Sequence, residues 1–273
     1  MGEFEQDIDS GQRFSFGANW KRFLATLDDE RIRQAEISVM DMLGLSDLNG
    51  LTFLDLGCGS GLFSLAARRK GATVHSLDYD PESVSCAQEL KRRYFASDED
   101  WTIERGSALD SEYIGGLEKF DIVYSWGVLH HTGSMWEALE NATLPVKVGG
   151  RLFISIYNDQ GLISKVWLKV KQAYCKGGLA RAAVLAVYIP YFVAIAVASG
   201  VIRHGNPVSR FTQYKKERGM SLYHDWIDWL GGLPFEVATA EDIFEFYKAK
   251  GFRLDRLKTT NRLGVNEFVF IKK

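Results

Sequence analysis

Cysteine is scarce in this sequence. Its three cysteines, Cys58, Cys86 and Cys175, are far apart and include no C-x-x-C pair. Such a sparse, odd set argues against a disulfide framework and against a structural zinc site, and it is typical of a reducing compartment. The N-terminal stretch MGEFEQDIDSGQRFSFG lacks the basic and apolar regions of a signal peptide. We therefore expect a cytoplasmic protein, and we predict no metal ion.

Acidic residues are scarce in one long stretch. Between Gly161 and Met220 the chain has ten basic residues and a single acid, Glu217, so this stretch carries a charge of +9. The whole chain has a net charge of only -2, which argues against DNA as a partner. The local asymmetry predicts that this region has a function of its own.

Charges are absent from residues 182–202, a run of 21 residues between Arg181 and Arg203. The length suits a membrane span, which needs about 20 apolar residues. Pro190, however, divides the run into halves of 8 and 12 residues, and proline inside a helix tends to break it. We therefore predict that the run is not a transmembrane anchor.

Strands and helices alternate along the first half of the chain. Short apolar strands are expected at residues 51–56, 72–78, 101–107, 120–126 and 149–157, and two more at 252–258 and 266–273. Helical patterns lie between them, and Thr239 is placed to begin the last helix as its N-cap. The alternation predicts an α/β fold with a parallel sheet covered on both faces. Ligands of such sheets bind at the carboxyl ends of the strands.

The first predicted strand runs into a glycine-rich turn. Gly57, Gly59 and Gly61 give the spacing G-x-G-x-G, which differs from the dinucleotide fingerprint G-x-G-x-x-G. Asp55 precedes the turn, and Asp78 ends the next strand, at a distance in sequence where a carboxylate can bind ribose hydroxyls. The alternative is a tight turn followed by a solvated aspartate.

The chain resembles the class I S-adenosylmethionine-dependent methyltransferases. The stretches that carry the resemblance are LDLGCGSG, HSLDYD, WGVLHHTGSMWEAL and VKVGGRLFISI. It covers residues 50–157 and resumes at 239–273. The resemblance implies a Rossmann-like, seven-stranded, mostly parallel sheet with helices on both faces and a helical lid inserted after the fifth strand. The chain would then divide into four segments. Residues 1–49 would cover the cofactor and residues 50–160 would form the core. Residues 161–237 would form the lid, and residues 238–273 would complete the core.

By the same resemblance, the cofactor is S-adenosylmethionine and its product is S-adenosylhomocysteine. The glycines would let the backbone approach the methionine part, and Asp78 would bind the ribose. Many members have an aspartate where this chain has Ser107, whose hydroxyl could still accept a hydrogen bond from adenine. The residues expected at the cofactor are Asp55, Gly57, Gly59, Gly61, Asp78, Tyr79, Ser107, Ala108, Trp126 and Trp20.

Residues 14–24, FSFGANWKRFL, precede the core and allow two interpretations. In related methyltransferases such a segment folds over the cofactor, which would bring Trp20 to the site. It could instead be a surface helix with a buried aromatic stripe.

Methyl transfer often requires a base that takes a proton from the acceptor, and histidine titrates nearest to neutral pH. His130 and His131 follow the fourth strand, and His131 is the preferred base, although the pair could also only pack. His224 adjoins Asp225 in an aromatic stretch and is either a base or part of a packed helix. Tyr157 ends the fifth strand and could orient the acceptor.

The inserted segment 161–237 has three competing interpretations. It could be a lid of mutually buried apolar helices with solvated lysines, a basic amphipathic surface that rests on anionic lipid, or a dimer interface. In its first part, Ile163, Val166, Trp167, Val170 and Tyr174 have helical spacing, and Lys165, Lys169 and Lys171 fall outside that stripe. Because strands of one sheet precede and follow the insertion, a single membrane crossing would place them on opposite sides of the bilayer.

The sequence lacks the motifs of several methyltransferase classes. Neither the Asn/Asp-Pro-Pro-aromatic stretch of base N-methylation nor the acid pair of arginine methyltransferases follows the fourth strand, and no cysteine suits cytosine methylation. The pattern resembles the ubiquinone-biosynthesis O-methyltransferase group. We therefore expect O-methylation of a small apolar or lipid-like acceptor. The alternatives are a thiol acceptor, and an RNA-modifying or non-catalytic cofactor-binding protein that uses the basic insertion.

Overall fold

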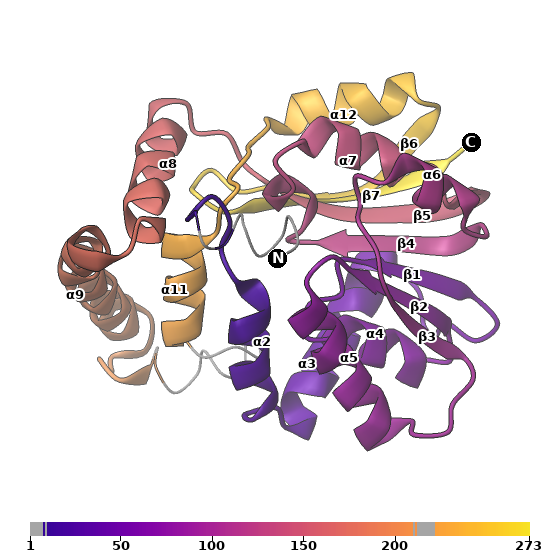
Figure 1. Ribbon diagram of the computed structural model, residues 1–273, viewed down its shortest axis with the longest axis horizontal. Helices are drawn as coiled ribbons and strands as arrows, with labels where there is room; N and C mark the ends of the chain where they lie inside the picture. Colours follow the sequence, from indigo (N-terminus) through magenta and orange to yellow (C-terminus); the bar gives the residue numbers. More distant parts are fainter. Residues whose placement is uncertain (1–7, 9, 210, 212–221) are drawn as a thin grey trace.

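Seven strands form one sheet within the described residues. Figure 1 shows the computed structural model, which describes residues 8, 10–209, 211 and 222–273. The strand order is β3-β2-β1-β4-β5-β7-β6. The strands are β1 (Thr52–Leu56), β2 (Thr73–Asp78), β3 (Trp101–Arg105), β4 (Phe120–Trp126), β5 (Val146–Tyr157), β6 (Phe252–Lys258) and β7 (Val265–Lys272). Strands β1 to β5 are parallel, whereas β7 is antiparallel to β5 and β6. The predicted α/β architecture is confirmed.

Helices cover both faces of this sheet (Figure 1). One apolar core includes side chains of α3, α4 and α5, and a second core includes side chains of α6, α7 and α12. The helices are α2 (Phe16–Leu24), α3 (Asp29–Leu43), α4 (Leu62–Arg69), α5 (Pro81–Tyr94), α6 (Ser111–Gly116), the 3₁₀ helix η1 (Leu129–His131), α7 (Met135–Asn141), α8 (Leu162–Cys175), α9 (Gly178–His204), α11 (Leu222–Gly231) and α12 (Ala240–Ala249).

Local sequence signals explain where these helices begin. The Asp80 carboxylate accepts from the Glu82 N–H at 2.8 Å, and Pro81 occupies the first helical position of α5, where its missing N–H costs nothing. Thr239 is the N-cap of α12 and forms a capping box with Asp242, as predicted for Thr239 from the sequence. These caps fix the helix starts near the loops that follow β2 and precede β6.

Helices α8, α9 and α11 follow β5 and lie beyond the carboxyl ends of the parallel strands (Figure 1). Their contacts centre on the buried side chains of Trp167, Tyr174 and Leu230. A bridge between Asn158 and Ala238 joins the two ends of this segment beside the sheet. The four-segment division of the chain stays a prediction.

Helix α9 differs from the expectation that Pro190 would divide the apolar run. The helix continues through Pro190 from Gly178 to His204. Tyr188 and Phe192 flank the proline and pack on Trp167, with ring centroids 5.3 and 6.4 Å apart. This packing offsets the lost backbone hydrogen bond, which costs about 3 kcal/mol in a helix interior.

Among the described residues, α9 is also the one helix that is long and apolar enough to cross a membrane. Strand β5 precedes it, β7 follows it, and the two pair directly in the sheet. A chain that crosses once cannot restore that pairing, so the topological argument against a single span holds without the proline.

Helix α8 corrects the predicted apolar stripe. Its buried side chains are Ser164, Trp167, Lys171 and Tyr174, whereas Ile163 and Val166 are exposed. Lys171, expected in solvent, is fully buried and donates from Nζ to the Trp229 carbonyl at 2.7 Å. Just 11% of the most apolar window of α9 is buried, so most of this window is not covered by α8 or α11.

Candidate functional site

The glycine turn after β1 requires glycine at several positions. Gly57, Gly59 and Gly61 have φ angles of 88°, 54° and 79°, which are unfavourable for other residues. A Cβ on Gly57 would lie 2.3 Å from a Val128 side-chain atom, and one on Gly61 would lie 2.8 Å from the Ala87 Cα. The turn therefore packs closely on the start of η1 and on α5, and it exposes backbone rather than side chains to a ligand.

Asp78 ties this turn to the end of β2. Its Oδ2 accepts from the Gly59 N–H at 2.8 Å, and its Oδ1 accepts from the Asp80 N–H at 2.9 Å. Each carboxylate oxygen can accept a further hydrogen bond, so ribose hydroxyls could still bind there. Burial raises the pKa of Asp78 to about 6.

Asp55 lies behind the turn in a buried hydrogen-bond chain. Trp101 Nε1 donates to Ser76 Oγ at 2.8 Å, and Ser76 Oγ donates to Ser64 Oγ at 2.7 Å. Ser64 Oγ then donates to Asp55 Oδ2 at 2.5 Å. Burial raises the pKa of Asp55 to about 7. Since Asp55 is only 2% exposed, this geometry suits anchoring of α4 better than direct contact with a ligand.

Helix α2 covers the glycine turn. A Cβ on Gly59 would lie 3.0 Å from Trp20 Nε1, and the Gly17 N–H donates to Asp80 Oδ2 at 2.8 Å. The same helix buries Phe23 and Leu24 in the core. One helix therefore lies against the turn and also buries an apolar stripe, and its role over the cofactor stays a prediction.

The predicted adenine-side residues lie around the ends of β2, β3 and β4. The Tyr79 ring lies between two guanidinium groups, with Arg13 Cζ 5.7 Å and Arg105 Cζ 5.6 Å from its centroid. Ser107 Oγ accepts from the Leu109 N–H at 3.1 Å. Its hydroxyl therefore already stabilises its own turn.

Two further predicted residues are held by longer-range hydrogen bonds. The Ala108 carbonyl accepts from Asn141 Nδ2 at 2.9 Å, and Trp126 Nε1 donates to Glu267 Oε1 at 2.9 Å. Glu267 on β7 thus fixes the Trp126 indole at the end of β4. The assignment of all ten residues to the cofactor stays a prediction.

His131 is held by a carbonyl from the inserted segment. Its Nδ1 lies 2.5 Å from the Pro234 carbonyl oxygen, and its ring packs on Phe16 and Tyr157, with centroids 5.0 and 5.4 Å away. Burial, with help from the positive charges of Lys171 and Arg13, lowers the pKa of His131 to about 3. The ring is therefore neutral at physiological pH.

His130 is more deeply buried than His131. Its ring is tilted against that of Tyr157 with the centroids 4.1 Å apart, and burial lowers its pKa well below the usual value. Neither of its ring nitrogens has a hydrogen-bond partner of good geometry among the described residues. The structure thus brings His130, His131 and Tyr157 into one cluster. The surroundings of His130 fit a packing role, whereas those of His131 fit a role in the reaction. The side chain of His224, on α11, lies outside the described residues.

Sequence spacing did not reveal the cationic groups of this cluster. Lys171 Nζ lies 5.8 Å from the Tyr157 ring centroid and 5.0 Å from that of Phe235, while Arg13 donates to the His131 carbonyl at 3.2 Å. Arg13 and Lys171 come from segments more than a hundred residues apart, and no local motif links them. The spacing of Lys171 placed it outside the apolar stripe of α8, so it was expected in solvent and not in this cluster.

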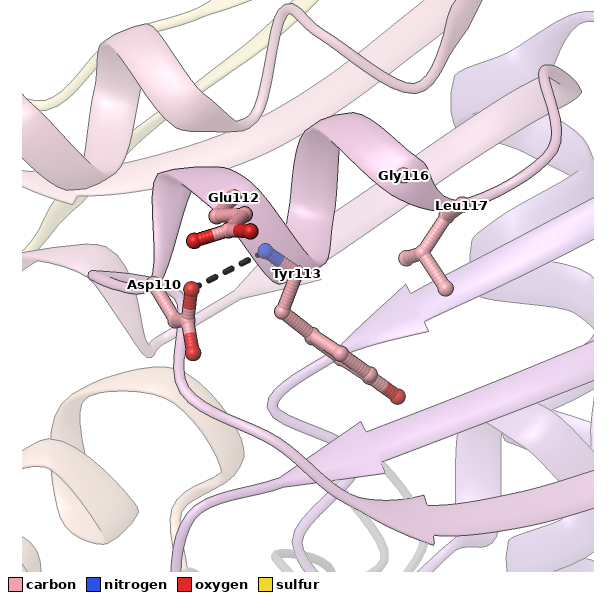
Figure 2. Close-up of a pocket in the computed structure, with 5 residues that line it drawn as sticks. All are labelled: Asp110, Glu112, Tyr113, Gly116 and Leu117. Atoms are coloured by element: carbon pink, nitrogen blue, oxygen red, sulfur yellow. Dashed lines mark hydrogen bonds between the residues drawn. The ribbon is translucent and has the colours of Figure 1, made fainter.

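Two hollows are present on the described surface. An open hollow of about 420 Å³ on α6 is lined by Asp110, Glu112, Tyr113, Gly116 and Leu117 (Figure 2). Asp110 accepts there from the Tyr113 N–H, which caps the helix, and none of the predicted site residues lines it. A cavity of about 260 Å³ lies between α2, α8 and α11 and includes Arg13, Arg22 and Arg181. It is the cavity nearer to the histidine cluster. No group of three potential ligands for a metal ion is found in the described part of the chain.

Comparison with known proteins supports the fold and the motif. The sequence model of the family described as "Methyltransferase domain" matches residues 54–152. The ubiquinone biosynthesis O-methyltransferase of Methylobacterium sp. (strain 4-46) is 32% identical over 119 residues, 43% of this chain and 45% of that protein. The enzyme of the same name from Brucella ovis is 32% identical over 111 residues, 41% of this chain and 43% of that protein. The matched part thus spans less than half the length of these relatives.

Among solved structures, magnesium protoporphyrin IX methyltransferase from Synechocystis PCC 6803 with bound SAH has a TM-score of 0.56 at 16% identity and covers 94% of both chains. At such low identity the likeness concerns the fold alone. The sequence match is more specific, because it begins on β1 and ends on β5 and so contains the glycine turn and Asp78. Together, the family match over residues 54–152 and the shared fold support a class I S-adenosylmethionine-dependent methyltransferase.

Proposed function

We propose that the chain transfers a methyl group from S-adenosylmethionine to an acidic hydroxyl, such as a phenol, on a small apolar acceptor. The observation that carries the proposal is the double contact of α2. Phe16 packs on His131, and Trp20 lies against Gly59. Residues four apart share one face of a helix. One helix face therefore contacts both the glycine turn and the histidine cluster.

The residues around the glycine turn fit the cofactor. The cradle has no room for Cβ atoms, and Asp78 retains acceptor capacity at the end of β2. The backbone at Gly59, the Asp78 carboxylate and the Trp20 indole would hold the cofactor. When bound, S-adenosylmethionine supplies a methyl group on a positively charged sulfur, which reacts with an in-line nucleophile.

His131 would orient the acceptor hydroxyl. The Pro234 carbonyl can only accept, so the neutral ring carries its proton on Nδ1 and presents Nε2 as an acceptor. A hydroxyl that donates to Nε2 would have its oxygen lone pair fixed in direction. The tautomer thus follows from a contact between η1 and the segment before α12.

The low pKa of His131 restricts the class of acceptor. With a pKa of about 3, this ring is a weak base and would not deprotonate an aliphatic alcohol. The positive charges of Lys171 and Arg13 disfavour the imidazolium form of His131. The same charges favour an anion close to the His131 ring. The acceptor oxygen must therefore give its proton to solvent, which is easy only if the hydroxyl is phenolic or similarly acidic. It then forms the bond to the methyl carbon as the bond from that carbon to sulfur breaks.

The walls of the cluster suit a planar acceptor. Tyr157 lies between His130, Trp229 and Phe235, with ring centroids 4.1, 6.1 and 5.1 Å away. Aromatic side chains bind flat apolar rings by stacking and edge contacts. A thiol would gain the same electrostatic help but fewer ring contacts.

The first experiment is calorimetric titration with S-adenosylmethionine, followed by a screen for S-adenosylhomocysteine release. The screen compares catechols and quinols with aliphatic alcohols, thiols and bulk tRNA. We expect cofactor binding and turnover on phenolic acceptors. Turnover on thiols or tRNA but not on phenols would contradict the proposed acceptor, and absence of cofactor binding would contradict the proposed activity.

A further inference from the structure

We infer that α8 and α9 form a docking surface for an anionic lipid bilayer, on which the protein rests without crossing it. The exposed apolar side chains of these two helices, together with the basic residues beside them, are called the α8–α9 surface. The inference uses no property of the methyl-transfer site and stands or falls independently of the proposed function.

The outer face of α9 is apolar along its whole length. Its large exposed side chains are Leu179, Val187, Tyr191, Ile195, Val201 and Ile202. Leu179 near one end is 91% exposed and Ile202 near the other is 83% exposed. A helix of 27 residues is about 40 Å long. Exposed apolar side chains spread along such a helix are the kind of patch that marks an interaction surface.

Helix α8 adds to the same surface. Leu162, Ile163 and Val166 are exposed, at 79%, 55% and 61%. The two helices pack on each other through Trp167 of α8 and Tyr188 of α9. The exposed apolar residues of α8 therefore belong to a helix that packs directly against α9.

Every formal charge from residue 161 to residue 204 is positive. Lys165, Lys169, Lys176, Arg181 and Arg203 are exposed, and no aspartate or glutamate occurs in this range. Arg181 and Arg203 stand at opposite ends of the uncharged run of α9. An apolar face with basic residues along it and at its ends is the pattern of a helix that lies in the headgroup region of an anionic membrane.

A bilayer fits this charge better than a second copy of the chain. Two such faces would bring like charges together with no acid in the segment to pair with them, and like charges across an interface are unfavourable. Anionic headgroups supply the missing opposite charge, because they attract each lysine or arginine near the surface. The β5–β7 pairing excludes a single crossing, so the helix lies along the membrane.

Flotation with lipid vesicles tests the inference. The full chain is mixed with vesicles of phosphatidylcholine alone, or of phosphatidylcholine with phosphatidylglycerol, and the recovered fraction is measured. We expect recovery with the anionic vesicles only, and a fall in recovery as salt rises because the charges are screened. Equal recovery with both vesicles, or none with either, would overturn the inference.

Matched variants locate the contact. Val187→Glu with Ile202→Glu places acids on the strip and should abolish recovery. Val148→Glu is the control, because Val148 is 79% exposed near the amino end of β5, outside the α8–α9 surface. Lys165→Gln with Lys169→Gln removes two charges and should lower the vesicle partition coefficient by about ten-fold or more. Equal losses in the control and the strip variant would contradict the location.

Two further measurements distinguish bilayer docking from misfolding of the variant and from dimerisation. Cofactor affinity and thermal melting should be unchanged in the strip variant, because its positions are exposed and remote from the glycine turn. Sedimentation velocity without lipid reports the oligomeric state. A dimer that the strip variant dissociates, together with no vesicle recovery, would overturn the inference in favour of a second copy.

Discussion

The backbone N–H of Gly59 donates to Asp78 Oδ2 at 2.8 Å, so the residue expected to bind ribose also holds the turn expected to bind methionine. One side chain therefore links the two halves of the cofactor site. A change at Asp78 affects ligand contact and turn geometry together, and the experiments below separate the two effects.

Asp78→Asn should weaken S-adenosylmethionine binding by about ten- to a hundred-fold, because hydrogen bonds to a charged acceptor contribute about 1.5–3 kcal/mol. The amide oxygen can accept from Gly59 or from Asp80 but not from both, so chemical denaturation in parallel reports any loss in the turn itself. Calorimetry at constant pH measures the affinity. Asp110→Asn, on the α6 hollow, is a control that should bind normally. Unchanged affinity in Asp78→Asn would refute the ribose role.

Gly61→Ala and Gly149→Ala should differ in stability. Both glycines have positive φ angles, 79° and 78°, but a Cβ would meet the Ala87 backbone only at Gly61. The left-handed conformation alone costs an alanine about 1–2 kcal/mol. Chemical denaturation should show that loss for Gly149→Ala and a larger loss for Gly61→Ala. Similar losses would mean that the close packing of the turn on α5 is unimportant.

His131→Ala should lower turnover by about a hundred-fold, because the acceptor hydroxyl loses the group that orients it, while cofactor affinity changes little. His204→Ala is the matched control, because His204 is exposed at the end of α9. With its pKa lowered to about 3, His131 should give no change in turnover near pH 6.5. A turnover equal to that of the control would remove His131 from the reaction.

Asp55→Asn should be most stabilising at high pH. The pKa of Asp55 is raised to about 7 in the folded protein, so the folded state holds a proton that the unfolded state releases above pH ~4. This contribution to stability is complete below the unfolded pKa of ~4 and is lost as the pH rises through 7. The loss in free energy of unfolding between pH 5 and 8.5 is about 2–3 kcal/mol. Denaturation across that range, in parallel for the variant, measures it. Identical pH profiles would contradict the raised pKa.

Much of the sheet could be predicted because its signals are local. Apolar runs bounded by glycine or aspartate gave the strands, and Thr239 marked the start of α12. The glycine turn was recognisable because positive φ angles and close backbone packing leave few alternatives to glycine. Each of these features depends on neighbours in sequence.

The contacts of the inserted segment could not be predicted in the same way. Pro190 predicts a break, but packing of Tyr188 and Phe192 on Trp167 keeps α9 continuous. The spacing of Lys171 predicts a solvent-facing side chain, yet the Trp229 carbonyl on α11 satisfies it in the interior. His131 and Pro234 are separated by 103 residues. Only the tertiary arrangement determines such contacts.

The bridge between Asn158 and Ala238 holds the two ends of the inserted segment next to each other. The Ala238 N–H donates to the Tyr157 carbonyl and the Asp159 N–H donates to the Ala238 carbonyl, at 3.0 and 3.1 Å. Because the entropy of closing a long loop grows only slowly with its length, insertions and deletions between these points cost the sheet little. Evolution could therefore exchange the inserted helices as a module while the cofactor turn stays unchanged. By altering this single segment, one scaffold could acquire new acceptors or bind a new surface in the cell.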